Sequence, residues 1–211
     1  MNPCCPRVLS VPYPLRLVLA SQPRVMSKVL RIVHRAISTY LIKKAGFTKK
    51  TARTGAVTLI QRFGGALNLN VHYHMLFLDG IYIDGAEKSD QRFVSVMNHK
   101  MTDIVKLSHK ISLRVARYLA QAGLIESDAD NTYLAEGSSD NIEMTLHQSH
   151  SITYRIAVGP QKGKKVFSLQ TLPPIVRETE RAILVAKVAG FSLHAGVCAS
   201  AIIDKAGKNS V

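Results

Sequence analysis

Two histidines separated by one residue, His72 and His74, are the side chains of this sequence best suited to chemistry. Successive side chains of a β-strand point to opposite faces, so on a strand both imidazoles would project from one face and Tyr73 from the other. Two neutral imidazoles at this spacing can bind a divalent metal when a third ligand completes the site. The alternative is a pair of ordinary surface histidines, because a chain with eight histidines often contains this spacing by chance.

The residues around the histidines predict an antiparallel meander. Strand patterns cover residues 54–63 and 69–78, with Gly64-Gly65 between them. Asp79-Gly80 is a hairpin turn signal, and residues 81–83 can continue as a third strand. The two histidines would then lie on the middle strand of this meander.

Two long helices are expected to pack against the sheet. Apolar residues recur at helical spacing over residues 24–45, where Ser21 could cap the helix and Gly46 could end it. A second helix is expected over residues 93–122, with Gly123 at its end. Each pattern has one apolar face, which a helix packed on a sheet requires.

Shorter segments complete the expected fold. Residues 7–11 predict a short strand that Pro12 and Pro14 terminate, and the polar, acidic residues 124–150 predict a loop. The other expected elements are two strands, a helix and a last strand, over residues 151–158, 165–170, 175–188 and 191–197. Together the patterns predict an α+β fold in which helices pack on an antiparallel sheet.

The charge of the chain indicates a polyanionic partner, with nucleic acid favoured over an anionic membrane surface. Lys and Arg number 28 against 14 Asp and Glu, and residues 1–78 hold 12 of these cations and no acidic residue. An ordinary solvated surface is the alternative. The candidate nucleic-acid contacts are a stripe on the first long helix and the cations that follow it: Arg24, Lys28, Arg31, Arg35, Lys49, Lys50, Arg53 and Arg62.

Composition excludes several classes of protein. An apolar share of 46% is enough for a folded core and argues against wholesale disorder. No run of 18 apolar residues exists, so neither a transmembrane helix nor a membrane partner is expected. The three cysteines, Cys4, Cys5 and Cys198, cannot all pair, which suits a reducing cytoplasm.

Several blocks of the sequence, in order, resemble one family. Residues 61–80, with His72-Tyr73-His74 inside them, resemble the His-hydrophobic-His block of the HUH transposases of rolling-circle insertion sequences, the putative transposase family. Four further blocks are similar to segments of that family: residues 11–16, 53–58, 151–160 and 190–197. The resemblance covers roughly residues 7–198, and it leaves residues 1–6 and 199–211 as unrelated ends.

The resemblance implies cleavage and joining of single-stranded or hairpin DNA on a palm-like sheet. It implies that His72 and His74 hold Mg²⁺ or Mn²⁺ with a third polar ligand, for which Gln61 and His194 are candidates. The metal would polarise the scissile phosphate, and a tyrosine from a downstream helix would attack it and stay attached to the 5′ phosphate.

One departure from the family affects activity. In the family the nucleophilic tyrosine follows the block that corresponds to residues 190–197, whereas the last tyrosine here is Tyr154. We therefore expect a transposase domain truncated at both ends, with no catalytic residue, which keeps DNA and metal binding and lacks strand cleavage. Two other classes are a non-enzymatic nucleic-acid module with idle histidines and, less favoured by the meander pattern, a metal-dependent hydrolase of the amidohydrolase-barrel kind.

Overall fold

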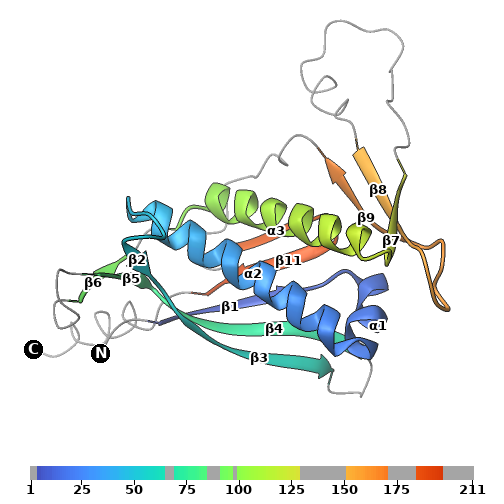
Figure 1. Ribbon diagram of the computed structural model, residues 1–211, viewed down its shortest axis with the longest axis horizontal. Helices are drawn as coiled ribbons and strands as arrows, with labels where there is room; N and C mark the ends of the chain where they lie inside the picture. The colour runs from blue at the N-terminus through green and yellow to red at the C-terminus, as the bar shows by residue number, and fades with distance from the viewer. Residues whose placement is uncertain are drawn as a thin grey trace, which may run out of the picture.

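A five-stranded antiparallel sheet is the central layer of the structure (Figure 1). The computed structural model describes residues 4–64, 69–84, 91–96, 99–128, 151–170 and 184–196. The strands of the sheet lie in the spatial order β10 (Leu184–Val188), β11 (Phe191–Ala195), β1 (Cys4–Ser10), β4 (Leu69–Leu78) and β3 (Ala56–Phe63). The expected α+β class with an antiparallel sheet is confirmed, and the open sheet shows that the amidohydrolase-barrel alternative is wrong.

Two small antiparallel sheets flank the central one at opposite ends (Figure 1). One contains β2 (Ala52–Arg53), β5 (Gly80–Ile83) and β6 (Arg92–Ser95), with β5 in the middle. The other contains β7 (Ile125–Asp128), β8 (Ser151–Ile156) and β9 (Lys165–Gln170), with β8 in the middle.

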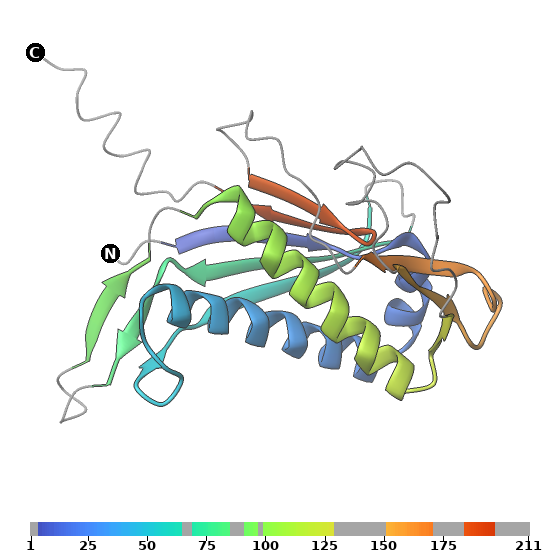
Figure 2. The same cartoon turned by 90° about the horizontal axis from the view of Figure 1, so that it is seen from above.

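Helices cover one face of the central sheet (Figure 2). They are α1 (Tyr13–Ser21), α2 (Pro23–Lys44) and α3 (Met101–Gln121), and α2 and α3 pack against each other. Their apolar stripes meet alternate residues of β4, all of them buried: Val71, Tyr73, Met75 and Phe77. No helix in the described part of the chain is long and apolar enough to cross a membrane.

The elements with a regular local pattern agree with the sequence prediction. Strand β4 has the predicted bounds, and α2 differs from its predicted range by one residue at each end. Gly46 has a φ of 83° just after α2, a left-handed conformation that glycine adopts without strain and that ends the helix. The predicted cap is wrong: Gln22 precedes α2, and the Ser21 hydroxyl donates to the Leu17 carbonyl instead.

Other predictions were wrong because local signals pointed elsewhere. The sequence analysis assigned no element to residues 13–21, which form α1, since proline is tolerated in the first turn of a helix. The second long helix begins at Met101, because residues 92–95 pair with β5 as strand β6. Residues 125–128, expected in a loop, are strand β7. Residues 184–188 of the expected helix 175–188 are β10; residues 171–183 lie outside the described part.

The predicted hairpin at Asp79-Gly80 is also wrong. The chain passes from β4 into β5, which leaves the central sheet and pairs with β2 and β6.

Strand β1 starts at Cys4, three residues earlier than expected, and pairs with β4 along its whole length. Cys5 is disulfide-bonded.

A buried polar cluster ties the helices to the sheet. The Arg7 side chain of β1 is 1% exposed, and its Nη2 lies 3.1 Å from Nε2 of His99. The same His99 nitrogen lies 3.2 Å from Oδ1 of Asp79, and the Tyr40 hydroxyl lies 2.8 Å from His99 Nδ1. Desolvation by burial lowers the pKa of Arg7, while Tyr40 and Asp79 oppose the shift. These contacts satisfy Nη2 of Arg7, whereas its Nε and Nη1 are buried without a hydrogen-bond partner among the described residues.

The junction of β4 and β5 gives the first test. A Cβ at Gly80 would overlap the Val94 carbonyl oxygen and lie 2.5 Å from Cζ of Phe93, so Gly80→Ala should separate β5 from β6. We expect the free energy of unfolding, measured by urea denaturation, to fall by about 1–3 kcal/mol. Gly55→Ala is the matched control, because a Cβ there would meet no atom within 4 Å. Equal stability of the two variants would contradict this account of the junction.

Candidate functional site

The two histidines of β4 lie on the sheet face that the helices leave open. Tyr73, between them, points the other way: its side chain is 0% exposed, and its hydroxyl donates to the Met26 carbonyl of α2 at 3.2 Å. His72 and His74 are half-buried, and their ring centroids lie 6.1 Å apart. The predicted alternation is therefore confirmed. Burial raises the pKa of Tyr73 and keeps its hydroxyl protonated.

A cavity of about 350 Å³ lies over the histidines on this open face. It is built across four neighbouring strands, because Gln61 of β3 and Ser10 of β1 are both register partners of His72. Two residues further along β4, His74 is the register partner of Val8 of β1. On its other side, Val8 is also the register partner of His194 of β11. The residues that line the cavity are Val8, Ser10, Gln61, Asn70, His72, His74 and His194.

A backbone hydrogen bond sets the orientation of His72. Its Nδ1 lies 3.1 Å from the Asn70 carbonyl oxygen, which can only accept, so Nδ1 carries the proton and donates. The other ring nitrogen, Nε2, then carries the lone pair. A donor bond from one imidazole nitrogen to a carbonyl is the arrangement that orients a metal-binding histidine.

Gln61 presents its amide oxygen to His74. Its Nε2 donates to the Phe63 carbonyl at 2.9 Å, which fixes the amide, and its Oε1 accepts a hydrogen bond from Nε2–H of His74 at 2.8 Å. A cation bound between these two atoms would replace that proton. The β3–β4 register shifts between Gln61 and Phe63, and this irregularity accompanies the local bond. Two potential ligand atoms, from adjacent strands, therefore converge at one point of the cavity.

His194 lines the same cavity from a greater distance. It lies on β11, two strands from β4, and strands are about 4.8 Å apart, so about 10 Å separates the backbones of His194 and His74. Its Nε2 lies 3.0 Å from the Ser192 hydroxyl. Both candidate third ligands thus face the cavity, and Gln61 is the nearer. No three histidine, cysteine or carboxylate side chains among the described residues come together as a metal cluster.

Apolar side chains border the histidines on the open face. Val57 and Leu59 of β3 are 68% and 71% exposed, and Leu76 of β4 is 47% exposed. Leu59 is the register partner of His74, and Val57 is the partner of Leu76. The site therefore combines imidazole and amide groups with an accessible apolar surface.

The eight predicted DNA-contacting cations do not share one surface. The stripe of Arg24, Lys28, Arg31 and Arg35 is exposed along α2, on the far side of the sheet from the histidines. Lys49 and Lys50 are exposed after α2, whereas Arg53 pairs with Asp84 at 3.2 Å. Arg62 is exposed on β3, the edge strand next to β4.

The sequence analysis missed three cations of α3. Lys106, Lys110 and Arg114 lie along the side of α3 that borders α2. They recur at intervals of four residues, a pattern that predicts one helix face. The signal was hidden because acidic residues outnumber basic ones in the surrounding segment, residues 79–150.

No tyrosine in the described part of the chain lines the cavity. Tyr73 and Tyr154 are buried in the core, Tyr40 and Tyr118 pack beside it, and Tyr13 is 72% exposed on α1. Tyr82 lies in β5 against the ring of Phe93. The seventh tyrosine, Tyr133, is outside the described residues.

Comparison with known proteins gives one match. A family model described as "Putative transposase" matches residues 55–199, which span the cavity strands β3, β4 and β11 together with α3. No curated protein and no solved structure matches the chain.

Separate roles for the two faces of β4 give a test by mutation. Tyr73→Ala should lower the free energy of unfolding by about 3–5 kcal/mol, because it removes a fully buried ring. His74→Ala, on the open face, should change it by no more than about 0.5 kcal/mol. Urea denaturation of both variants measures the difference. A large loss of stability for His74→Ala would mean that the histidine supports the fold.

Proposed function

The chain belongs to the putative transposase family, and we propose that it acts on DNA at the open face of its central sheet. In this proposal the cavity over His72 and His74 binds one divalent cation and the phosphate backbone of a single DNA strand, as in an HUH transposase. The observation that carries it is one cavity lined by two imidazoles and the Gln61 amide, whose Oε1 accepts a hydrogen bond from His74 Nε2 at 2.8 Å.

The cation in this proposal is Mg²⁺ or Mn²⁺, for which the amide oxygen of Gln61 is a suitable ligand. Ligand atoms in neighbouring octahedral positions, each about 2.0–2.1 Å from Mg²⁺, lie about 3 Å apart. The 2.8 Å between His74 Nε2 and Gln61 Oε1 is close to that separation, and His72 presents Nε2 from the next position on the same face. We therefore propose Gln61, in preference to His194, as the third ligand.

The proposed ligands are all uncharged, and this favours a phosphate as the next ligand. Two imidazoles and one amide leave the charge of a divalent cation uncompensated, and Mg²⁺ is usually bound with substrate phosphates or water in its remaining positions. A bound cation would polarise a phosphodiester and stabilise the negative charge that develops on it. Ser10 and Asn70 line the cavity and can donate hydrogen bonds to phosphate or sugar oxygens.

The apolar border of the cavity supports a single strand as the substrate. Unpaired bases can lie against apolar side chains, and Leu59, Val57 and Leu76 offer such a surface beside the proposed metal ligands. In a duplex the bases are stacked and paired, so these side chains would face the backbone only.

We also propose that the chain forms no covalent tyrosyl–DNA intermediate. A nucleophile must lie about 3 Å from the phosphorus, in line with the bond that breaks. The cavity lining contains no tyrosine among the described residues, and Tyr73 is held in the core by its bond to Met26. DNA and metal binding without covalent joining is the resulting proposal.

Metal binding can be tested directly. We expect Mn²⁺, followed by electron paramagnetic resonance or calorimetry, to bind at one site, and His72→Ala and His74→Ala to weaken it by about tenfold or more. Gln61→Ala should weaken binding more than His194→Ala, and Gln61→Glu should tighten it through the added charge. His109→Ala, on α3, is the control. Unchanged binding in His72→Ala would favour a non-enzymatic module with idle histidines.

The absence of covalent joining has its own assay. After incubation with Mn²⁺ and labelled single-stranded oligonucleotides, we expect no protein–DNA adduct that survives a denaturing gel. An adduct that a single Tyr→Phe change abolishes would identify the nucleophile and refute this part of the proposal. Tyr133→Phe belongs in that series, together with the other six tyrosines.

A further inference from the structure

We infer that the groove between α2 and α3 is a second DNA-binding surface, which takes the phosphate backbone of duplex DNA. Helices α2 and α3 cover one face of the central sheet (Figure 2), and the histidines lie on the opposite face, because Tyr73 between them points to α2. The inference goes beyond the proposed function, because it depends on neither a metal nor the open-face cavity.

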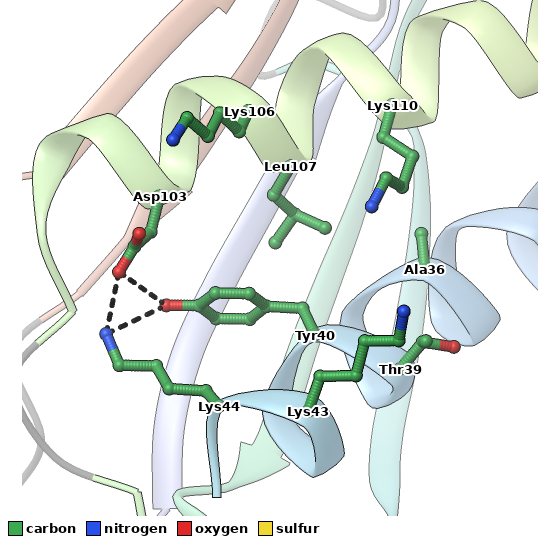
Figure 3. A pocket seen from close by; sticks show the side chains of 9 residues that line it. All are labelled: Ala36, Thr39, Tyr40, Lys43, Lys44, Asp103, Lys106, Leu107 and Lys110. Carbon is green, nitrogen blue, oxygen red and sulfur yellow. Dashed lines mark hydrogen bonds and ion pairs between the residues drawn. The ribbon is translucent and has the colours of Figure 1, made fainter. Parts of the chain in front are cut away.

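The groove consists of two cavities along the line where α2 and α3 meet. One has a volume of about 340 Å³ (Figure 3) and is lined by Ala36, Thr39, Tyr40, Lys43, Lys44, Asp103, Lys106, Leu107 and Lys110. The other, of about 380 Å³, is lined by Ile32, Arg35, Lys49 and Arg114. Both helices therefore contribute cations to the two cavities, and Lys49, which follows α2, adds one more.

The positive charge of the groove is largely uncompensated. Asp103 is the one carboxylate that lines either cavity in the described part of the chain, and Lys44 pairs with it at 2.7 Å. Desolvation raises the pKa of Asp103, but the hydrogen bond and charge of Lys44, together with the hydrogen bonds from the Lys100 backbone and Tyr40, outweigh it, so the pKa is lowered. No described carboxylate forms an ion pair with the six other cations, Arg35, Lys43, Lys49, Lys106, Lys110 and Arg114.

These cations also repel one another. The pKa of Lys49 is lowered by partial desolvation and by the charges of Arg35, Arg114 and Lys43. A bound anion would relieve that repulsion, and a polyanion would do so at several cations at once.

The spacing of the cations suits a phosphate backbone. Lys106, Lys110 and Arg114 are four residues apart on α3, which corresponds to steps of about 6 Å along the helix. One strand of B-DNA carries a charge about every 3.4 Å along its axis, so the row offers one cation for roughly two phosphates. Lys43 and Arg35 of α2 add cations on the opposite wall of the groove.

The groove offers no platform for unpaired bases, and this favours a duplex. Proteins that bind single strands usually stack bases on exposed aromatic rings. Tyr40 is the one aromatic residue that lines either cavity in the described part, and Lys44 Nζ lies 5.7 Å from its ring centroid. Its hydroxyl is engaged by His99, Lys44 and Asp103. Recognition in the groove would therefore involve the backbone and not the bases.

Charge reversal in the groove tests the inference. We expect Lys106→Glu/Lys110→Glu to weaken binding of a labelled duplex at least tenfold, measured by fluorescence anisotropy over a range of salt concentrations. The slope of log K against log salt should become shallower by about 2, since each phosphate contact contributes roughly 0.9. The matched control is Lys162→Glu/Lys164→Glu, which makes the same charge change in the exposed β8–β9 turn, away from α2 and α3 (Figure 1).

The same experiment separates this inference from the proposed function. His72→Ala should keep full duplex binding, and Lys106→Glu/Lys110→Glu should keep Mn²⁺ binding, which also shows that the variant is folded. If that variant does not fold, Lys106→Gln/Lys110→Gln replaces it, with a smaller loss in the same direction. The inference is wrong if the groove variant loses no more duplex affinity than the control. It is also wrong if single-stranded DNA loses as much affinity as the duplex.

Discussion

The two-residue repeat of β4 is the constraint on which the rest of the structure depends. Tyr73 must enter the core beneath α2, and this requirement turns His72 and His74 to the opposite face. Because β4 lies between β1 and β3, backbone pairing fixes the register of both neighbouring strands. Gln61 of β3 and Ser10 of β1 are therefore the register partners of His72. One strand thereby supplies part of the core and the centre of the site.

Features encoded by local pattern were predictable from the sequence, whereas those decided by distant pairing were not. The alternation over residues 69–78 and the helical stripe over residues 24–45 identified β4, α2 and the shared face of the histidines. The direction of β5 depends on β2 and β6, and no local signal encodes that choice. The approach of Gln61 to His74 likewise depends on the register of two strands, so the sequence could name it only as one of two candidates.

The cluster around Arg7 shows why the helical layer has one position on the sheet. An apolar interface can slide with little loss, but a buried guanidinium needs its partners in fixed places. Arg7 and His99 are 92 residues apart in sequence, and Tyr40 reaches the same imidazole from α2. The cluster therefore fixes the helices that carry the cationic groove relative to the strand that carries the histidines, with the sheet between the two surfaces.

The alternation along β4 also has an evolutionary consequence. Val71, Tyr73 and Met75 are buried in the core, whereas the proposed chemistry would depend on the residues between them, on the open face. A lineage can therefore lose its activity through substitutions on the open face and still inherit a stable protein. Because the core residues and the open-face residues of β4 are different residues, substitutions on the open face leave the packing of the core unchanged. The scaffold can therefore acquire a different chemistry in its descendants.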